Sequence, residues 1–204
     1  MEVRERLIPA GLVASAVLGA AAAAALQHAG RFRTLDWPTL AALEHPWWLG
    51  VGEVVGGIAC ALGALSLAAL GFRHAGTSAL ATLGVILVWF AGLGAVAIAA
   101  LHLGLIRAAS GGVLDAIRYG NRWDWWYGLG WAFFAIGGVI GLLALGVGVA
   151  RGNRRLRYPA ACLAGSAVLL ILFAPLGAVL LLVALVWLAV AISRTSGSTP
   201  VPAG

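Results

Sequence analysis

Long apolar runs occupy most of the 204-residue chain, and they constrain its fold more than any other feature. Hydrophobic residues make up 62% of the sequence and charged residues 10%, whereas a soluble domain carries about 25% charged residues. Inside a bilayer every backbone N–H and C=O group must be hydrogen-bonded within the protein, so spanning segments are helices or closed barrels. Because the runs have the length of about 20 residues that a helix needs to cross, we expect an all-α integral membrane protein.

The apolar runs predict a helical bundle of six transmembrane helices that form one domain over residues 1–194. Two polar stretches, 28–46 and 107–124, are predicted to lie at the membrane interface, and 195–204 is predicted to be a disordered tail. The predicted spans are 7–27, 47–72, 77–106, 125–150, 160–174 and 176–192.

The two ends of this predicted bundle each allow an alternative. Arg4 and Arg6 precede an Ala-rich run, as in a cleaved signal peptide, although the length of the run favours a retained span. Residues 159–192 are apolar throughout and too long for one crossing. Pro175 predicts a break there, so this region forms either two short spans joined by a turn at 174–177 or a re-entrant hairpin.

A Trp-Trp-x-Gly-x-Gly motif occurs twice, at 47–52 and at 125–130. The same offset aligns Arg73 with Arg151. We interpret this match as an internal repeat in which the first four spans are a duplicated helical hairpin and the last two a short Pro-joined hairpin. The repeats would be parallel, because the matching segments lie two spans apart and cross in the same direction.

All 13 basic residues are arginines, and they lie mainly in short loops beside the predicted spans. Eight of them would face one side of the membrane and five the other, which predicts cytoplasmic N- and C-termini in a plasma or inner membrane. This placement also argues against a nucleic-acid partner. The Trp-rich loops would then lie outside and form an outer aromatic belt. The predicted belt consists of Trp37, Trp47, Trp48, Trp123, Trp125 and Trp126.

Glu53 is the one carboxylate inside a predicted span. A charge at such a position costs about 2.5 to 3.5 kcal/mol even on lenient insertion scales, so Glu53 requires a partner, a proton or water. His28 and His102 stand near the outer ends of the first and third spans, at a similar depth. These three residues predict an outward-facing polar pocket for a ligand or ion. Residues from the interfacial stretches that could extend it are Asp36, His45, Arg107 and Asp124.

Two imidazoles and a carboxylate can bind a divalent metal, hold a haem or pass protons to a quinone, and His28, His102 and Glu53 are the candidate metal ligands. No histidine pair stands at mid-bilayer, which disfavours haem, and the sequence requires no cofactor. The alternative is that each of these side chains is satisfied locally by helix contacts. Cys60 and Cys162 fall in apolar runs and are interpreted as buried hydrophobic residues.

Three functions remain open. The first is a non-catalytic subunit or interaction protein of a membrane complex, and the Gly-x-x-x-Gly patterns at 52–56, 137–141 and 148–152 would serve partner contacts, a homo-oligomer or internal packing. The second is a transporter of a small solute, an ion or protons that uses Glu53. The third is a quinone-, haem- or metal-binding redox protein. Motifs of soluble enzymes, such as HExxH or a Walker loop, are absent from the sequence, so catalysis is the less favoured expectation.

Overall fold

The computed structural model describes residues 2–28, 46–74 and 78–196, and every regular element in these ranges is a helix. The all-α prediction is therefore confirmed for the described residues. Six of the described helical segments are long and apolar enough to cross a membrane, as predicted, and they are called the six spans below. They run over Leu7–His28, Trp47–Arg73, Ala79–Ala109, Val113–Gly152, Arg154–Leu172 and Ala174–Arg194.

The first three spans are long single helices: α1 (Glu2–His28), α3 (Pro46–His74) and α4 (Ala79–Ala109). The turn after α4 depends on Gly112, whose φ of 118° lies in a region that side chains with a Cβ rarely adopt. The chain can therefore reverse within a few residues and begin the next helix at Val113.

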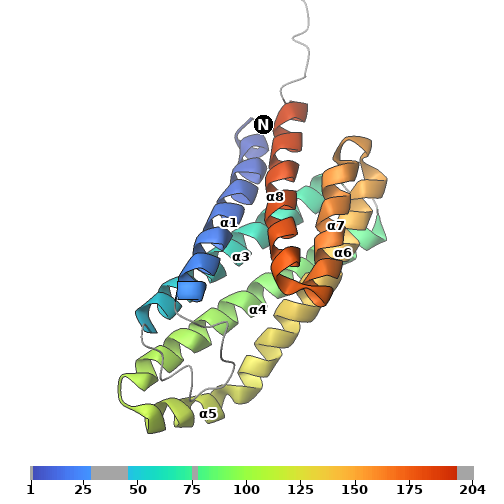
Figure 1. Ribbon diagram of the computed structural model, residues 1–204. Helices are drawn as coiled ribbons and strands as arrows, with labels where there is room; N and C mark the ends of the chain where they lie inside the picture. Colours follow the sequence, from blue (N-terminus) through green and yellow to red (C-terminus); the bar gives the residue numbers. More distant parts are fainter. Residues whose placement is uncertain (1, 29–45, 75–77, 197–204) are drawn as a thin grey trace, which may run out of the picture.

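The fourth span is one continuous helical run made of α5 (Val113–Ala132), the π-helical turn η2 (Phe133–Gly137) and α6 (Gly138–Gly152). Residues 113–124 of the predicted interfacial stretch and the predicted span from 125 therefore share one helical run. Nothing in 113–124 breaks a helix, and Asp115 and Arg118 form a pair one turn apart, with 3.7 Å between Oδ1 and Nη1. In Figure 1, α5 lies across one end of the bundle before the chain turns into η2 and α6.

The last two spans are α7 (Arg157–Leu172), which follows the short 3-10 turn η3 (Arg154–Leu156), and α8 (Ala174–Ser196). The chain breaks at Phe173, whose φ and ψ of −153° and 80° are not helical. Pro175 falls in the first turn of α8, where its missing N–H removes no hydrogen bond from the helix. The break thus lies just before the 174–177 segment in which the sequence placed it.

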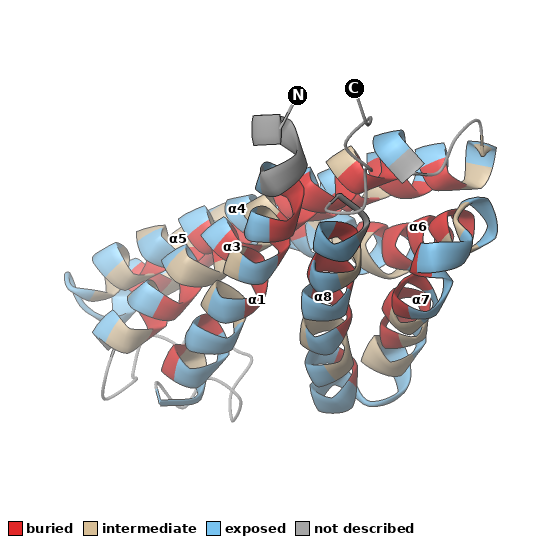
Figure 2. Ribbon diagram, turned by 90° about the horizontal axis from the view of Figure 1, so that it is seen from above, coloured by how far each residue is buried: buried red, intermediate tan, exposed pale blue. Residues whose placement is uncertain are grey.

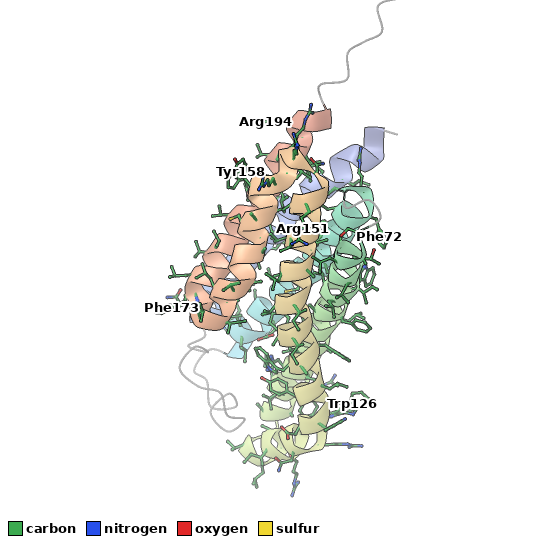
Figure 3. All side chains as sticks on the ribbon, turned by 90° about the vertical axis from the view of Figure 1, so that its right-hand side faces the viewer. Phe72, Trp126, Arg151, Tyr158, Phe173 and Arg194 are labelled. Carbon is green, nitrogen blue, oxygen red and sulfur yellow. The ribbon has the colours of Figure 1, made fainter. Side chains whose placement is uncertain are left out.

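The helices pack side by side in a closed circuit. Going round, α1 contacts α3, α3 contacts α4, α4 contacts α6, α6 contacts α7, α7 contacts α8, and α8 returns to α1. Seen from above in Figure 2, buried residues line the facing sides of the helices and exposed residues the outer sides. The outer surface is rich in apolar side chains, such as Phe72, Trp126 and Phe173, as expected for contact with lipid (Figure 3).

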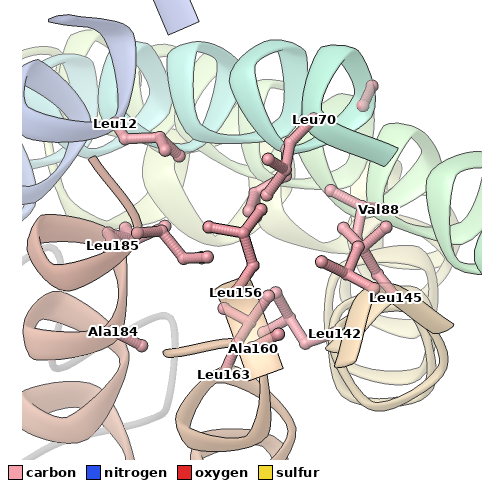
Figure 4. Close-up of a cluster of buried hydrophobic side chains, with 14 of the residues drawn as sticks. Leu12, Leu70, Val88, Leu142, Leu145, Leu156, Ala160, Leu163, Ala184 and Leu185 are labelled. Carbon is pink, nitrogen blue, oxygen red and sulfur yellow. The ribbon is translucent and has the colours of Figure 1, made fainter. Parts of the chain in front are cut away.

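A large buried cluster joins all six spans around one half of the bundle (Figure 4). One member from each span illustrates it: Leu12, Leu70, Val88, Leu145, Leu163 and Leu185. Leu156, 1% exposed, extends into the same cluster from η3. The α7 and α8 pair is therefore held to the first four spans by apolar side chains.

Backbones approach closely between α4 and α6, and glycine makes this possible. A Cβ added at Gly141 would lie 2.8 Å from the backbone nitrogen of Val88, and one at Gly148 would lie 2.7 Å from the Cβ of Ala81. Helices in lipid associate through such close packing, since lipid tails leave no hydrophobic driving force between them. The glycines of the 137–141 pattern and Gly148 are thus used inside the molecule.

We predict that Gly84→Ala destabilises the fold. The new methyl group would collide with the backbone nitrogen of Leu145 on α6, and such overpacking typically costs about 1 to 3 kcal/mol. The free energy of unfolding in mixed micelles measures the effect. Gly128→Ala is the matched control, because no atom lies within 4 Å of its added Cβ. Equal stability of the two variants would contradict the close packing of α4 on α6.

Candidate functional site

Glu53 lies on the buried side of α3, with an exposed fraction of 6%. It stands seven residues after the start of the helix at Pro46, which places it about 10 Å along the axis from that end. No proline interrupts α3 after Pro46, so the regular helix fixes the position of Glu53. A carboxylate is therefore held inside a span that is otherwise apolar.

His102 lies at the matching depth on α4, seven residues before the end of that helix at Ala109. Its exposed fraction is 0%. Because α3 and α4 are consecutive spans that pack along each other, the start of α3 and the end of α4 meet at the same end of the bundle. Because Glu53 and His102 stand the same distance from these two helix ends, they lie at the same depth in the bundle.

The two side chains form an ion pair within the bundle. His102 Nδ1 lies 3.1 Å from Glu53 Oε1, and the exposed fractions of the two side chains are 0% and 8%. The distance is that of an ion pair, but the angle at Nδ1 is not that of a well-aligned hydrogen bond. A rotation of either side chain would align the N–H with the carboxylate oxygen. A buried carboxylate and a protonated imidazole offset each other's charge in an apolar bundle.

Tyr127 of α5 approaches the other side of the same imidazole. Its hydroxyl oxygen lies 3.3 Å from His102 Nε2, and the two ring centroids are 5.3 Å apart in an edge-to-face arrangement. The three side chains, called the Glu–His–Tyr chain below, connect α3, α4 and α5. Both nitrogens of His102 therefore face a polar group from a different helix.

A small apolar cluster lies on the side of the Glu–His–Tyr chain that is nearer the helix ends. Leu49, Leu105 and Ala116 form its centre, and each is at most 1% exposed. Trp48 and Tyr119 pack against it from α3 and α5. This cluster separates the ion pair from the end of the bundle, so the pair lies in a surrounding of low dielectric constant.

The Glu–His–Tyr chain can hold a proton in two ways. With neutral His102 carrying its proton at Nδ1, that nitrogen lies 3.1 Å from the Glu53 carboxylate and Nε2 accepts the hydrogen of the Tyr127 hydroxyl. With protonated His102, Nε2–H donates to the Tyr127 oxygen instead, and the pair of Glu53 and His102 becomes net neutral. Uptake of one proton at Nε2 thus reverses the direction of the hydrogen bond to Tyr127.

The other described residues of the predicted pocket lie elsewhere. His28 is exposed at the end of α1 and packs edge-to-face on Trp48, with the ring centroids 5.2 Å apart. Arg107 and Asp124 are exposed on α4 and α5. His45 and Asp36 fall outside the described residues. Of the predicted set, the described contacts join Glu53 with His102.

The described tryptophans of the predicted aromatic belt lie at the start of α3 and on α5. Trp47 and Trp48 begin α3 and pack on each other, with centroids 4.0 Å apart. Trp125 and Trp126 are 76% and 55% exposed on α5. Trp123 is half-buried beside Tyr119, and Trp37 lies outside the described residues.

No group of three histidine, cysteine or carboxylate side chains gathers as metal ligands within the described ranges. The ion pair of Glu53 and His102 supplies two candidate ligands, and His28 packs on Trp48 rather than completing a set of three.

Tyr127 was not among the predicted site residues, although it stands inside the second Trp-rich motif. Its place in that motif corresponds to Leu49, which is fully buried in the apolar cluster. Trp131, the counterpart of Glu53, contacts the ring of Tyr127 at a centroid distance of 6.3 Å. A polar residue in one copy of the motif, where the other copy has leucine, was the signal that could have identified it.

Comparison of this chain with known protein families, with curated proteins and with solved structures found no match.

We predict that Glu53 and Tyr127 are energetically coupled through His102. In a double-mutant cycle, Glu53→Gln and Tyr127→Phe should be non-additive by about 0.5 to 1.5 kcal/mol in the free energy of unfolding, because both contact the same imidazole. Tyr119→Phe is the control, since its hydroxyl faces Gly104 on α4 instead. Additive effects in both cycles would show that the three side chains do not act as a unit.

Proposed function

We propose that this protein is a small membrane transporter that moves protons, and that the Glu–His–Tyr chain is the group that carries them. The observation that supports the proposal most directly is the 3.1 Å pair of Glu53 and His102, buried among apolar helices. Ionisable residues within membrane spans are costly, and they commonly mark proton or ion pathways. Histidine suits this role because its ordinary proton affinity lies near neutral pH.

The chemistry of the chain gives the proposal a mechanism. A proton that reaches Tyr127 can pass to His102 Nε2, and the resulting imidazolium is stabilised by the Glu53 carboxylate at Nδ1. Release from the Glu53 side, by transfer of the Nδ1 proton, restores the neutral imidazole once the ring or its hydrogen bonds rearrange. No covalent or redox step is needed.

The outer surface of the described residues favours this function over that of a partner subunit. Exposed apolar side chains are spread over all six spans, with Val17, Ile58, Leu93, Ile136, Ile171 and Val179 as one example from each. Such an even distribution fits lipid contact and marks no face for a partner subunit.

The orientation follows from the arginines. With the termini in the cytoplasm, the Glu–His–Tyr chain would lie toward the outer face of the membrane, beneath the Trp-rich segments. Protons would then enter from outside through the end of the bundle at which α5 lies.

The proposal predicts proton uptake that depends on Glu53. The purified protein is reconstituted into vesicles loaded with a pH-sensitive dye, and a potassium diffusion potential, negative inside, drives protons inward. We expect uptake faster than in empty vesicles. Glu53→Gln should reduce it to the level of empty vesicles, because the amide cannot balance an imidazolium on His102.

Asp115→Asn is the matched control for this measurement. It also neutralises a carboxylate, but Asp115 is exposed at the start of α5 and is paired with Arg118. It should transport as the native protein does. Native protein no faster than empty vesicles, or Glu53→Gln as fast as native, would refute the proposal.

A further inference from the structure

A cavity of about 170 Å³ lies within the bundle, away from the Glu–His–Tyr chain. Its walls come from α1, α3, α4, α8 and the fourth span. Ser15, Ala64 and Leu185 are buried in its wall, whereas Gly19, Phe134 and Leu182 are half-exposed. The cavity is therefore partly open along its edge, and a molecule from the membrane can reach it.

The space is not a by-product of close helix packing. At Gly63 and Gly92 an added Cβ would come within 2.6 Å of Ser15 Oγ and 2.9 Å of the Ala64 Cβ, so these glycines serve helix contacts. At Gly19 and Gly138 the nearest atoms would be 3.4 and 3.7 Å away, at ordinary contact distance. Larger side chains could occupy the last two positions, yet glycine there leaves the cavity open.

The π-helical turn is a second feature that points to the same cavity. Phe134 belongs both to η2 and to the cavity wall, and Gly138 follows directly after η2. Single π-helical turns inside long helices occur frequently at functional sites, because the wider turn alters how side chains and backbone face a ligand. Here the altered turn and the cavity coincide.

The chemistry of the wall defines the ligand. None of the residues that line the cavity carries a charge. The hydroxyl of Ser15 donates a hydrogen bond to the carbonyl of Ala59 at 2.7 Å and keeps lone pairs that can accept one. Cys60 adds a half-buried thiol. An apolar cavity of about 150 Å³ in another protein holds a benzene molecule, which sets the size of the expected ligand.

We propose that this cavity binds a small uncharged molecule, of about the size of a substituted benzene, that is mostly apolar and carries one hydrogen-bond donor for Ser15. The site is separate from the proton pathway and does not depend on it. Ligands of this class partition into membranes and can enter from the side of the bundle. Phenol has the required size and one donor, so it serves as the probe.

Cys60 provides the measurement. In a Cys162→Ala background, the rate at which methyl methanethiosulfonate modifies Cys60 is followed by mass spectrometry, with the full chain in detergent micelles. Bound phenol blocks access, so the rate should fall saturably, by about tenfold at a phenol concentration ten times its dissociation constant. A rate that phenol does not change overturns the proposal.

Matched variants separate binding from indirect effects. Gly19→Leu fills the cavity and should remove the dependence on phenol, whereas Gly165→Leu, whose added Cβ would meet only Leu180 at 3.8 Å and lies outside the cavity, should retain it. Gly138→Leu replaces Gly19→Leu if the latter does not fold. Persistence of phenol protection in a folded cavity-filling variant would also overturn the proposal.

Two further variants make the outcome independent of proton transport. In Cys60→Ala, the remaining Cys162 lies between α7 and α8 and its modification should not respond to phenol. In Glu53→Gln, protection of Cys60 should persist, because Glu53 does not line the cavity. Loss of proton uptake with retained protection, or the reverse, would show which of the two proposals fails. A phenol response of Cys162 equal to that of Cys60 would assign the effect to the micelle and overturn the site.

Discussion

Close contact between helix backbones is the constraint on which the rest of this structure depends. Apolar side chains gain little by leaving lipid for another helix, so the spans associate where small residues allow dispersion contacts and where polar groups meet. The approach of α4 to α6 at Gly141 and Gly148 is of the first kind. The hydrogen bond from Ser15 on α1 to the carbonyl of Ala59 on α3 is of the second. Together with the apolar cluster around Leu145 and Leu163, such contacts close the circuit of helices.

The Glu–His–Tyr chain takes its character from this packing. In water, a carboxylate 3.1 Å from an imidazole would be a minor contact, since solvent screens it. Between α3, α4 and α5 the same two side chains have few other hydrogen-bonding partners. The backbone groups of each helix already form hydrogen bonds within that helix, and the neighbours Leu49 and Leu105 are apolar. The protonation state of His102 therefore determines the direction of its hydrogen bond with Tyr127.

Much of the architecture followed from local features of the sequence, but positions along and around the helices did not. The helix that carries the fourth span starts at Val113, within the stretch predicted to lie at the interface, because the charged side chains of 118–124 do not prevent a helix. The second Trp-rich motif consequently lies within a helix, whereas the first begins one, at Pro46. The apolar pattern of the sequence did not predict the π-helical turn at Phe133–Gly137. The proposed internal repeat remains a prediction from the sequence.

The sequence by itself determined that the chain is helical and apolar enough to cross a membrane six times within the described residues. The length and hydropathy of a segment are local properties, and they decide whether that segment can cross the lipid bilayer as a helix. It also singled out Glu53 and His102, because charged and titratable side chains are rare in such spans. The tertiary structure decided that His102 lies against Glu53 while His28 packs on Trp48, that Tyr127 joins the pair, and that a cavity opens beside Cys60. Helices that are apolar on every side carry no pattern that reveals their rotation, so only the packing of one backbone against another could determine which residues meet.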